Sequence, residues 1–192
     1  THGLNDKDEG IEILQDDVIF LRKDGSAYGS ERGFYLKTEG LDCVTQPIIY
    51  KAATSRDTIF ENVMIDYDGN LYFEDDTLTS NGRGIMMRED LSPYVSNNIN
   101  LPPIDDMDGL IVAFITRRHT VVPLAARLTP EQAAATFMLG ESIETSAGDP
   151  KRAGESIREV GTNPFIIGDK SYEGNWFYDF VKRHEGKVQC YQ

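Results

Sequence analysis

Two adjacent carboxylates, Asp16 and Asp17, follow a short apolar run near the start of the sequence. Hard divalent cations take oxygen ligands, and an aspartate at the end of a strand supplies one rigidly. Adjacent acidic residues are also common on solvated surfaces. The pair alone therefore leaves both a metal site and an ordinary surface pair open.

A second acidic run, Glu74-Asp75-Asp76, is followed by a polar stretch that ends in a single arginine, Arg83. A guanidinium group can bind phosphate or carboxylate through two parallel hydrogen bonds. One interpretation is therefore an anion clamp beside a metal, and the other is a solvated hairpin with a charged tail.

The densest basic cluster is Arg117-Arg118-His119, which follows the apolar run from Leu110 to Ile115. Loops at strand ends are where α/β proteins form their sites, but an ordinary charged loop fits this pattern equally well. No HExxH, CxxC or GxxxxGK[ST] motif occurs, and the histidines have no nucleophile at a diagnostic spacing.

Composition limits the classes of partner. The chain has 192 residues, 19 basic and 32 acidic, for a net charge of −13, which argues against nucleic acid and anionic membranes. No apolar run approaches the roughly 20 residues of a membrane span. Two cysteines without metal-ligand spacing favour a reducing compartment. The start at Thr1 and the strand-like end suggest a fragment of a longer protein.

Hairpins and interspersed helices must position these residues. Asp68-Gly69 between two β-forming runs predicts a hairpin over 63–73, which places the acidic run at the exit of a hairpin strand. Thr129-Pro130-Glu131-Gln132 predicts a capped helix that runs to about Leu139. Further expectations are strands over 11–14, 18–21, 33–38 and 187–192, a buried central strand over 110–115, helices over 47–53 and about 175–184, and loops over 145–174.

This mixture predicts an α/β fold with α+β character, in which helices flank a mixed β-sheet. Residues 1–192 are expected to form a single lobe.

Several segments, in the same order, resemble the C-terminal, nucleotide-binding lobe of ATP-dependent phosphoenolpyruvate carboxykinase. The stretch from Glu61 to Arg83 is similar to the family's E-N-V, D-G hairpin and F-D-D-G-S-x-T-E-N-T-R. "SERGFYLKT" resembles its E-G-G-C-Y-A-K-T, and "VAFITRRHTVVPLAARLTPEQAAATFMLG" resembles its F-L-T…P-P-V-x-x-L-T-x-x-Q-x-x-x-x-F-L-S-G. Together these segments cover most of residues 11–148.

The resemblance implies roles for particular residues. Arg83 would lie between substrate and nucleotide phosphate as the catalytic cation, and Lys37 would contact nucleotide. Asp17, with Asp16, would hold the divalent metal. Gln46 stands where the family has a glutamate that contacts the nucleotide, and its amide can still hydrogen-bond a ribose. Thr116-Arg117-Arg118-His119 replaces the family's T-A-D-A-F.

The implied fold is the carboxykinase-like C-terminal lobe without its phosphate loop, which would precede Thr1. The parent, a divergent bacterial protein of the cytoplasm, would convert oxaloacetate and ATP to phosphoenolpyruvate, CO₂ and ADP. It would use Mg²⁺ with the nucleotide, and Mn²⁺ is a candidate at the substrate. Its partners would be nucleotide, a small dicarboxylate and the rest of the parent chain, and the fragment alone would be inactive. Two alternatives remain open: a kinase with another acceptor, and a non-catalytic nucleotide-binding relative.

Overall fold

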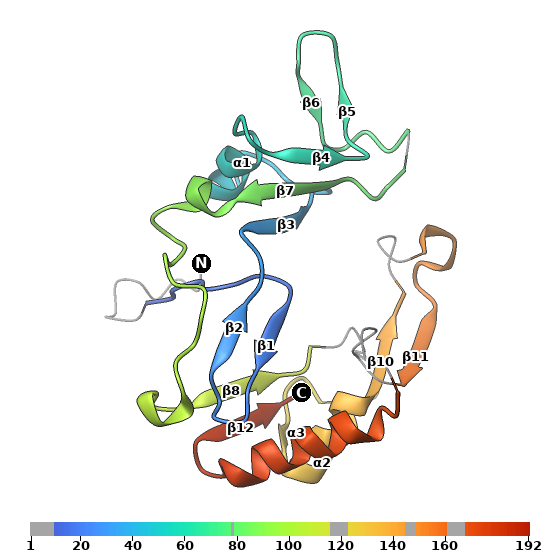
Figure 1. Ribbon diagram of the computed structural model, residues 1–192. Helices are drawn as coiled ribbons and strands as arrows, with labels where there is room; N and C mark the ends of the chain where they lie inside the picture. The colour runs from blue at the N-terminus through green and yellow to red at the C-terminus, as the bar shows by residue number, and fades with distance from the viewer. Residues whose placement is uncertain (1–9, 78, 116–122, 145–148, 161–167) are drawn as a thin grey trace. The chain divides into compact units, whose positions relative to one another are not determined.

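The computed structural model of the protein describes residues 10–77, 79–115, 123–144, 149–160 and 168–192 (Figure 1). These residues form two compact units. The first unit comprises the described parts of Thr1–Leu21 and Ala27–Leu101, and the second those of Arg22–Ser26 and Pro102–Gln192. Each unit has its own small sheets and its own buried residues.

The first unit is built on an antiparallel three-stranded sheet, ordered β3 (Gly33–Lys37), β7 (Arg83–Met87) and β4 (Ile59–Glu61). Side chains alternate between the two faces of each strand. One face carries Phe34 and Met86, which pair across β3 and β7 and are buried. The strand predicted over 33–38 is thus confirmed.

Helix α1 (Pro47–Ala53) packs on that buried face. Proline suits the first helical position because its missing N–H would have no partner there, and the predicted bounds are confirmed. The buried core of this unit consists of Phe34, Leu41, Ala52, Ala53, Met86 and Leu91. The 3₁₀ turn η2 (Arg88–Leu91) follows β7 directly.

Two hairpins complete the first unit. Strands β5 (Met64–Ile65) and β6 (Leu71–Tyr72) pair around Asp68-Gly69 as predicted, and the hairpin projects from the sheet (Figure 1). Strands β1 (Ile19–Leu21) and β2 (Ala27–Gly29) form the other hairpin.

The strand expected over 11–14 is wrong, because among the described residues this segment forms only a single bridge, from Ile13 to Val95. The carbonyl of Leu14 accepts a hydrogen bond from the Arg88 side chain instead of from a neighbouring strand.

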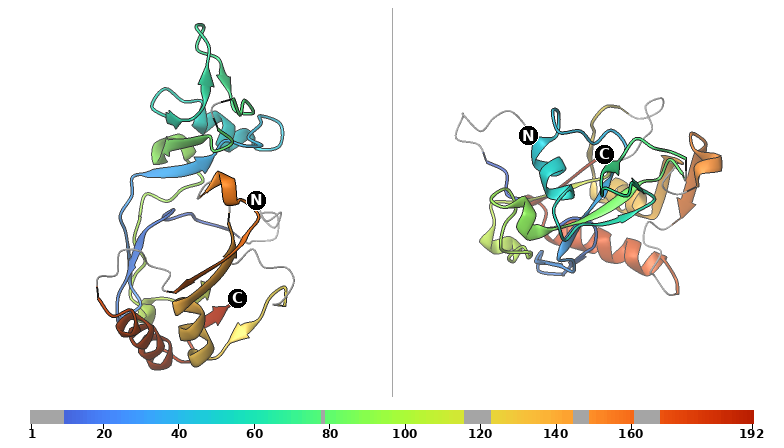
Figure 2. Two further views of the ribbon diagram at one scale, coloured as in Figure 1. Left: turned by 90° about the vertical axis from the view of Figure 1, so that its right-hand side faces the viewer. Right: turned by 90° about the horizontal axis from the view of Figure 1, so that it is seen from above.

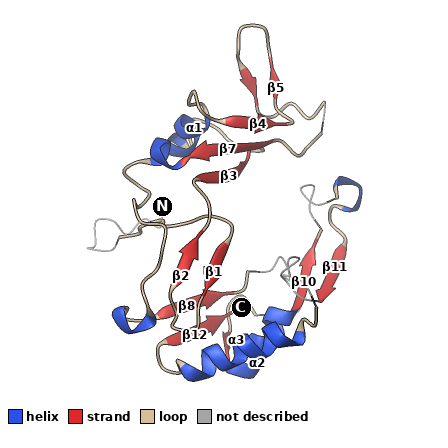
Figure 3. Ribbon diagram, viewed as in Figure 1, coloured by secondary structure: helices blue, strands red, loops and turns tan. Residues whose placement is uncertain are grey.

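The second unit contains a mixed sheet of β8 (Leu110–Ala113), β12 (Val188–Tyr191) and β9 (Arg127–Leu128). Strand β12 lies between the others, parallel to β8 and antiparallel to β9. Helices α2 (Pro130–Met138) and α3 (Ser171–Arg183) lie side by side (Figures 2 and 3). Phe137 of α2 stacks on Phe177 of α3 with ring centroids 4.6 Å apart.

Three expectations for this unit need correction. In the described sheet β8 is an edge strand and not a buried central one, and Ile111 is 68% exposed. Helix α3 begins at Ser171, four residues before the predicted start at Asn175. The segment expected to be loop contains β11 (Ser156–Val160), which pairs with β10 (Leu139–Ile143). The flanking glycine- and proline-rich segments hide this strand from a periodicity argument. Short 3₁₀ turns occupy Ile104–Asp106 (η3) and Pro150–Arg152 (η4).

Mixed strands and a few helices confirm the α/β class. The described residues distribute these strands over several small sheets instead of one. Within the described ranges, no helix combines the length and the apolar character that crossing a lipid bilayer requires. The single lobe and the missing phosphate loop stay predictions.

Candidate functional site

Lys37 and Arg83 are direct partners in the register of β3 and β7, and Glu61 of β4 is the partner of Arg83 on its other side. Directly opposite residues of antiparallel strands project from the same face, with Cβ atoms roughly 4.5–5.5 Å apart. The two cations are therefore neighbours on the face opposite Phe34 and Met86. The sheet brings together two residues that lie far apart in the sequence.

The backbone beside this pair is tightly packed. Thr38 N donates to Gly82 O at 3.0 Å, directly beyond the Lys37–Arg83 pair. A Cβ on Gly82 would come within 2.2 Å of Thr38 Oγ1, and Thr38 is fully buried. Asn62, at φ 59°, donates from Nδ2 to Asn81 O at 3.1 Å. These contacts fix the starting point of β7 and hence the position of Arg83.

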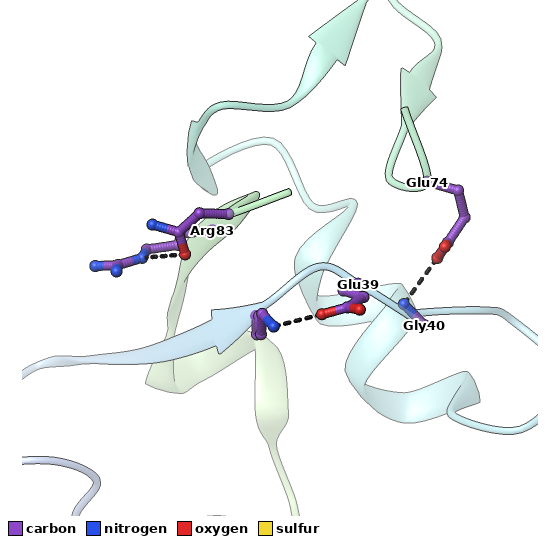
Figure 4. Close-up of polar contacts among 6 residues, drawn as sticks. Glu39, Gly40, Glu74 and Arg83 are labelled. Carbon is purple, nitrogen blue, oxygen red and sulfur yellow. Dashed lines mark hydrogen bonds and ion pairs between the residues drawn. The ribbon is translucent and has the colours of Figure 1, made fainter. Parts of the chain in front are cut away.

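Both cations have side-chain partners within the first unit. Arg83 Nε donates to Asn81 Oδ1 at 3.0 Å, and Lys37 forms an ion pair with Glu39 (Figure 4). The hydrogen bond from Lys37, together with its charge, holds the pKa of Glu39 below its usual range. The Lys37 side chain remains 41% exposed, so an anion in solvent can reach its ammonium group.

Two residues of the acidic run 74–76 accept hydrogen bonds from backbone N–H groups, one distant in the sequence and one local. Glu74 Oε1 accepts from Gly40 N at 2.7 Å, and Asp75 Oδ1 accepts from Thr77 N at 2.9 Å. Figure 4 shows the Arg83 guanidinium extending away from Glu74. The acidic run and Arg83 therefore have separate roles: Glu74 and Asp75 accept hydrogen bonds from loop residues, and Arg83 is a residue of the sheet.

Asp16 lies at the free edge of the same sheet. Its Oδ2 accepts a hydrogen bond from Tyr35 N at 2.7 Å, two residues before Lys37 on β3. Burial raises the pKa of the Asp16 carboxyl above its usual range, and the charges of Glu31 and Asp17 raise it further, against the Tyr35 hydrogen bond. Asp17 follows directly, and its backbone N–H donates to Glu31 Oε2 at 3.1 Å.

Gln46 occupies a different place. It is the N-cap residue of α1, which packs on the core face, and its side chain makes no capping hydrogen bond. The Gln46 amide donates instead to Gly40 O at 3.3 Å. The structure thus gathers Asp16, Lys37 and Arg83 on one sheet and places Gln46 at the start of the helix behind it.

The carboxylates of Asp16 and Asp17 supply the oxygen ligands that hard divalent cations prefer. Among the residues that the structure describes, no three His, Cys, Asp or Glu side chains gather in a way that would hold a metal ion. Mg²⁺ usually takes only one or two carboxylates and completes its octahedron with water and substrate phosphates. Asp16 and Asp17 fit such a partial ligand set. Arg117, Arg118 and His119 lie outside the described residues.

Two residues near the site were missed by sequence reasoning. Glu31 contacts the segment that carries the aspartates. Arg88 donates from Nη1 to Leu14 O at 2.7 Å and lies over the Phe34 ring at 5.3 Å. The sequence did offer one signal for Glu31: it belongs to "SERGFYLKT", one of the segments that carry the resemblance. Nothing in the local sequence pattern indicated Arg88.

The family model described as phosphoenolpyruvate carboxykinase matches residues 5–191 of the chain. A protein of Aeropyrum pernix named phosphoenolpyruvate carboxykinase (ATP) is 35% identical over 94% of the chain and 35% of its own length. Proteins of the same name from Rhodopseudomonas palustris and Ruegeria pomeroyi are 28% and 30% identical, over 96% and 84% of the chain and 33% and 30% of their own lengths. The chain thus spans about a third of the length of these relatives.

Proposed function

The chain belongs to the phosphoenolpyruvate carboxykinase family, and from this premise we propose that it handles the nucleotide phosphates and the metal in an ATP-dependent carboxykinase. The parent reaction would convert oxaloacetate and ATP to phosphoenolpyruvate, CO₂ and ADP. Because the chain spans about a third of its relatives, the remaining substrate contacts would come from other parts of the protein.

One observation carries the proposal: Lys37 of β3 is the register partner of Arg83 of β7, and Asp16 lies at the free edge of β3. Phosphoryl transfer needs little covalent chemistry from a protein, and it depends on positioning and on stabilising negative charge. Two cations beside a carboxylate ligand for Mg²⁺ supply this combination. Arginine suits the transferring group because it stays protonated and binds oxygen pairs bidentately.

The chemistry balances without an added oxidant or proton donor. The C–C bond to the departing carboxylate of oxaloacetate breaks, CO₂ leaves, and the electron pair remains as an enolate. The enolate oxygen then attacks the γ-phosphorus of ATP, and the bond to the β–γ bridging oxygen breaks to release ADP. Negative charge spreads over the γ-phosphoryl oxygens at this stage, and the Arg83 guanidinium would stabilise it.

Lys37 would contact the nucleotide phosphates, which would replace Glu39 as the partner of its ammonium group. Asp17 and Asp16 would hold Mg²⁺, which, when bound, neutralises phosphate charge. Gln46 would hydrogen-bond a ribose hydroxyl through its exposed amide. A second metal such as Mn²⁺ would belong to the dicarboxylate, outside the residues assigned here.

The test uses the full-length protein that contains this chain. Formation of phosphoenolpyruvate from oxaloacetate and MgATP would be measured for wild type, Arg83→Ala, Arg83→Lys and Arg56→Ala. Arg56 is an exposed arginine of the same unit that the proposal does not use. Loss of an arginine that stabilises phosphoryl charge typically lowers kcat by about 10³- to 10⁵-fold. We expect such a loss for Arg83→Ala, partial activity for Arg83→Lys and full activity for Arg56→Ala.

Other outcomes separate the alternatives. Arg83-dependent ATP consumption without phosphoenolpyruvate would indicate a kinase with another acceptor. Nucleotide binding without any turnover would indicate a non-catalytic nucleotide-binding relative. If neither ATP nor GTP binds at millimolar concentration, the proposal is wrong.

A further inference from the structure

The Asp16–Asp17 segment is fastened to the residues that precede β3. The backbone ladder of the β1–β2 hairpin ends at the pair Ile19–Gly29. Beyond that point side chains continue the attachment: Ser30 Oγ donates to Val18 O at 2.8 Å. The chain segment that contains both aspartates is therefore held by residues 30 and 31 instead of by a strand partner.

Glu31 makes two of these attachments with a single oxygen. Its Oε2 accepts from Asp17 N at 3.1 Å and from Gln15 Nε2 at 3.2 Å. The half-buried carboxylate thus contacts the residues on either side of Asp16. Hydrogen bonds to an ionised acceptor are roughly twice as strong as neutral ones, so Glu31 is suited to hold this short bend in one conformation.

Asp16 is restrained from the other direction by Tyr35 N of β3 at 2.7 Å. Only one residue separates Glu31 from Gly33, where β3 begins. The geometry of the two aspartates is therefore tied through Glu31 and Tyr35 to the strand that carries Lys37. A cation held by the aspartates would keep a fixed position relative to that lysine.

Glu31 also places a third carboxylate beside the pair, through its contacts with Gln15 and Asp17. A divalent cation relieves repulsion among carboxylates, and the loss of a group that orients a metal ligand typically weakens metal binding.

We propose that Glu31 is a positioning residue that holds Asp17, and with it the Asp16–Asp17 pair, in the conformation that binds a divalent cation. Glu31 acts through the backbone of Asp17 and does not itself contact the metal. The inference rests on the proposed function in one respect, the assignment of the aspartates as metal ligands.

The test measures Mn²⁺ affinity in the presence of ATP by electron paramagnetic resonance of the full-length protein. Removal of a group that orients a metal ligand typically costs about 10- to 100-fold in affinity. We expect this loss for Glu31→Ala. Glu31→Gln should restore most of the affinity, because its amide oxygen can still accept from Asp17 N. Glu89→Ala and Glu89→Gln, which change an exposed glutamate of η2, should bind Mn²⁺ as wild type does.

Ser26→Ala separates positioning from general stability, since it removes the hydrogen bond from Ser26 Oγ to Asp24 Oδ1 in the turn between β1 and β2 without touching Glu31 or the segment that it holds. It should leave Mn²⁺ affinity within about twofold of wild type, a difference well below the loss expected for an orienting group. If Glu31→Ala does not fold, Glu31→Asp replaces it. That variant keeps the charge but retracts the acceptor, and it should bind Mn²⁺ more weakly.

Each remaining outcome is decisive. Unchanged Mn²⁺ affinity in folded Glu31→Ala or Glu31→Asp overturns the inference and leaves the proposed function intact. Equal losses in Glu31→Gln and Glu31→Ala would show that charge and not position matters, which also overturns it. If wild type with ATP binds no Mn²⁺, both the inference and the metal role in the proposed function are wrong.

Discussion

Glu39 would compete with any phosphate for the ammonium group of Lys37, because the two side chains already form an ion pair. Exposed ion pairs of this kind contribute little to stability, so their main consequence here is for ligand binding. Glu39→Gln removes the competing charge and should tighten ATP binding by roughly two- to fivefold. Isothermal titration of the full-length protein with MgATP would measure the change.

The control for this prediction is a double-mutant cycle. In a Lys37→Met background, Glu39→Gln should have no further effect on the dissociation constant. An equal gain in both backgrounds would mean that Glu39 repels the nucleotide through the general field and not through Lys37.

Gly82 is a position where one added carbon atom would disturb the packing. A Cβ there would lie 2.2 Å from Thr38 Oγ1, inside a fully buried region. Overpacking of this kind costs about 1–3 kcal/mol, so Gly82→Ala should lower the urea midpoint. Gly10→Ala, with nothing within 4 Å of its added Cβ, serves as the matched control. A Gly82→Ala variant as stable as Gly10→Ala would contradict the packing argument.

At the scale of single residues, the sequence predicted only some of the residues of the candidate site. The resemblance selected Arg83, Lys37 and Asp16, which the structure brings together on one sheet. Composition and spacing could not make this selection, because register pairing joins positions 46 residues apart (83 minus 37). Glu31 was missed for a similar reason: its value depends on the fold of the segment around Asp17, 14 residues earlier.

At the scale of elements, the β5–β6 hairpin is organised by one carboxylate. Asp66 accepts from Asp68 N, Asn70 N, Asn70 Nδ2 and Tyr72 Oη, and these hydrogen bonds, led by those from Asn70, lower its pKa to about 2. A depressed carboxyl pKa contributes stability that is present above the unfolded value of 3.8 and is lost as pH falls towards 2.

The Asp66→Asn variant should therefore be less stable than wild type at neutral pH. The difference should shrink between about pH 5 and pH 2 as wild-type Asp66 becomes protonated. Thermal unfolding followed by circular dichroism across this range would measure it. Asp68→Asn, which changes a carboxylate of the same turn that accepts none of these hydrogen bonds, serves as the matched control.

Helix α2 begins with a capping box that the sequence predicted. Thr129 Oγ1 accepts from Gln132 N at 3.3 Å, and Gln132 Oε1 accepts from Thr129 N at 2.9 Å. Replacing a capping threonine by alanine costs about 1 kcal/mol, so Thr129→Ala should lower the free energy of unfolding by that amount. Thr129→Ser keeps the acceptor and should stay close to wild type in urea titrations. Equal stability of all three proteins would show that the box contributes nothing.

The elements that were predicted correctly carry strong local signals. Pro47 and Thr129-Pro130 mark helix starts, and Asp68-Gly69 marks a turn with Gly69 at φ 83°. The errors arose where tertiary pairing decides. Leu110–Ala113 has an apolar composition suited to a central strand, yet in the described sheet β12 takes that place. No local pattern can specify which of two strands acquires neighbours on both sides.

At the scale of the whole molecule, the net charge of −13 should destabilise the folded chain through self-repulsion. Added salt screens such repulsion, since the Debye length falls from roughly 30 Å at 0.01 M to about 8 Å at 0.15 M. We therefore expect Tm at pH 7 to rise when NaCl is increased over this range. Near the sequence pI of about 4.6 the net charge approaches zero, and the same addition should change Tm little. A Tm that falls with salt at pH 7 would mean that local ion pairs such as Lys37–Glu39 and Lys182–Glu185 outweigh the general field.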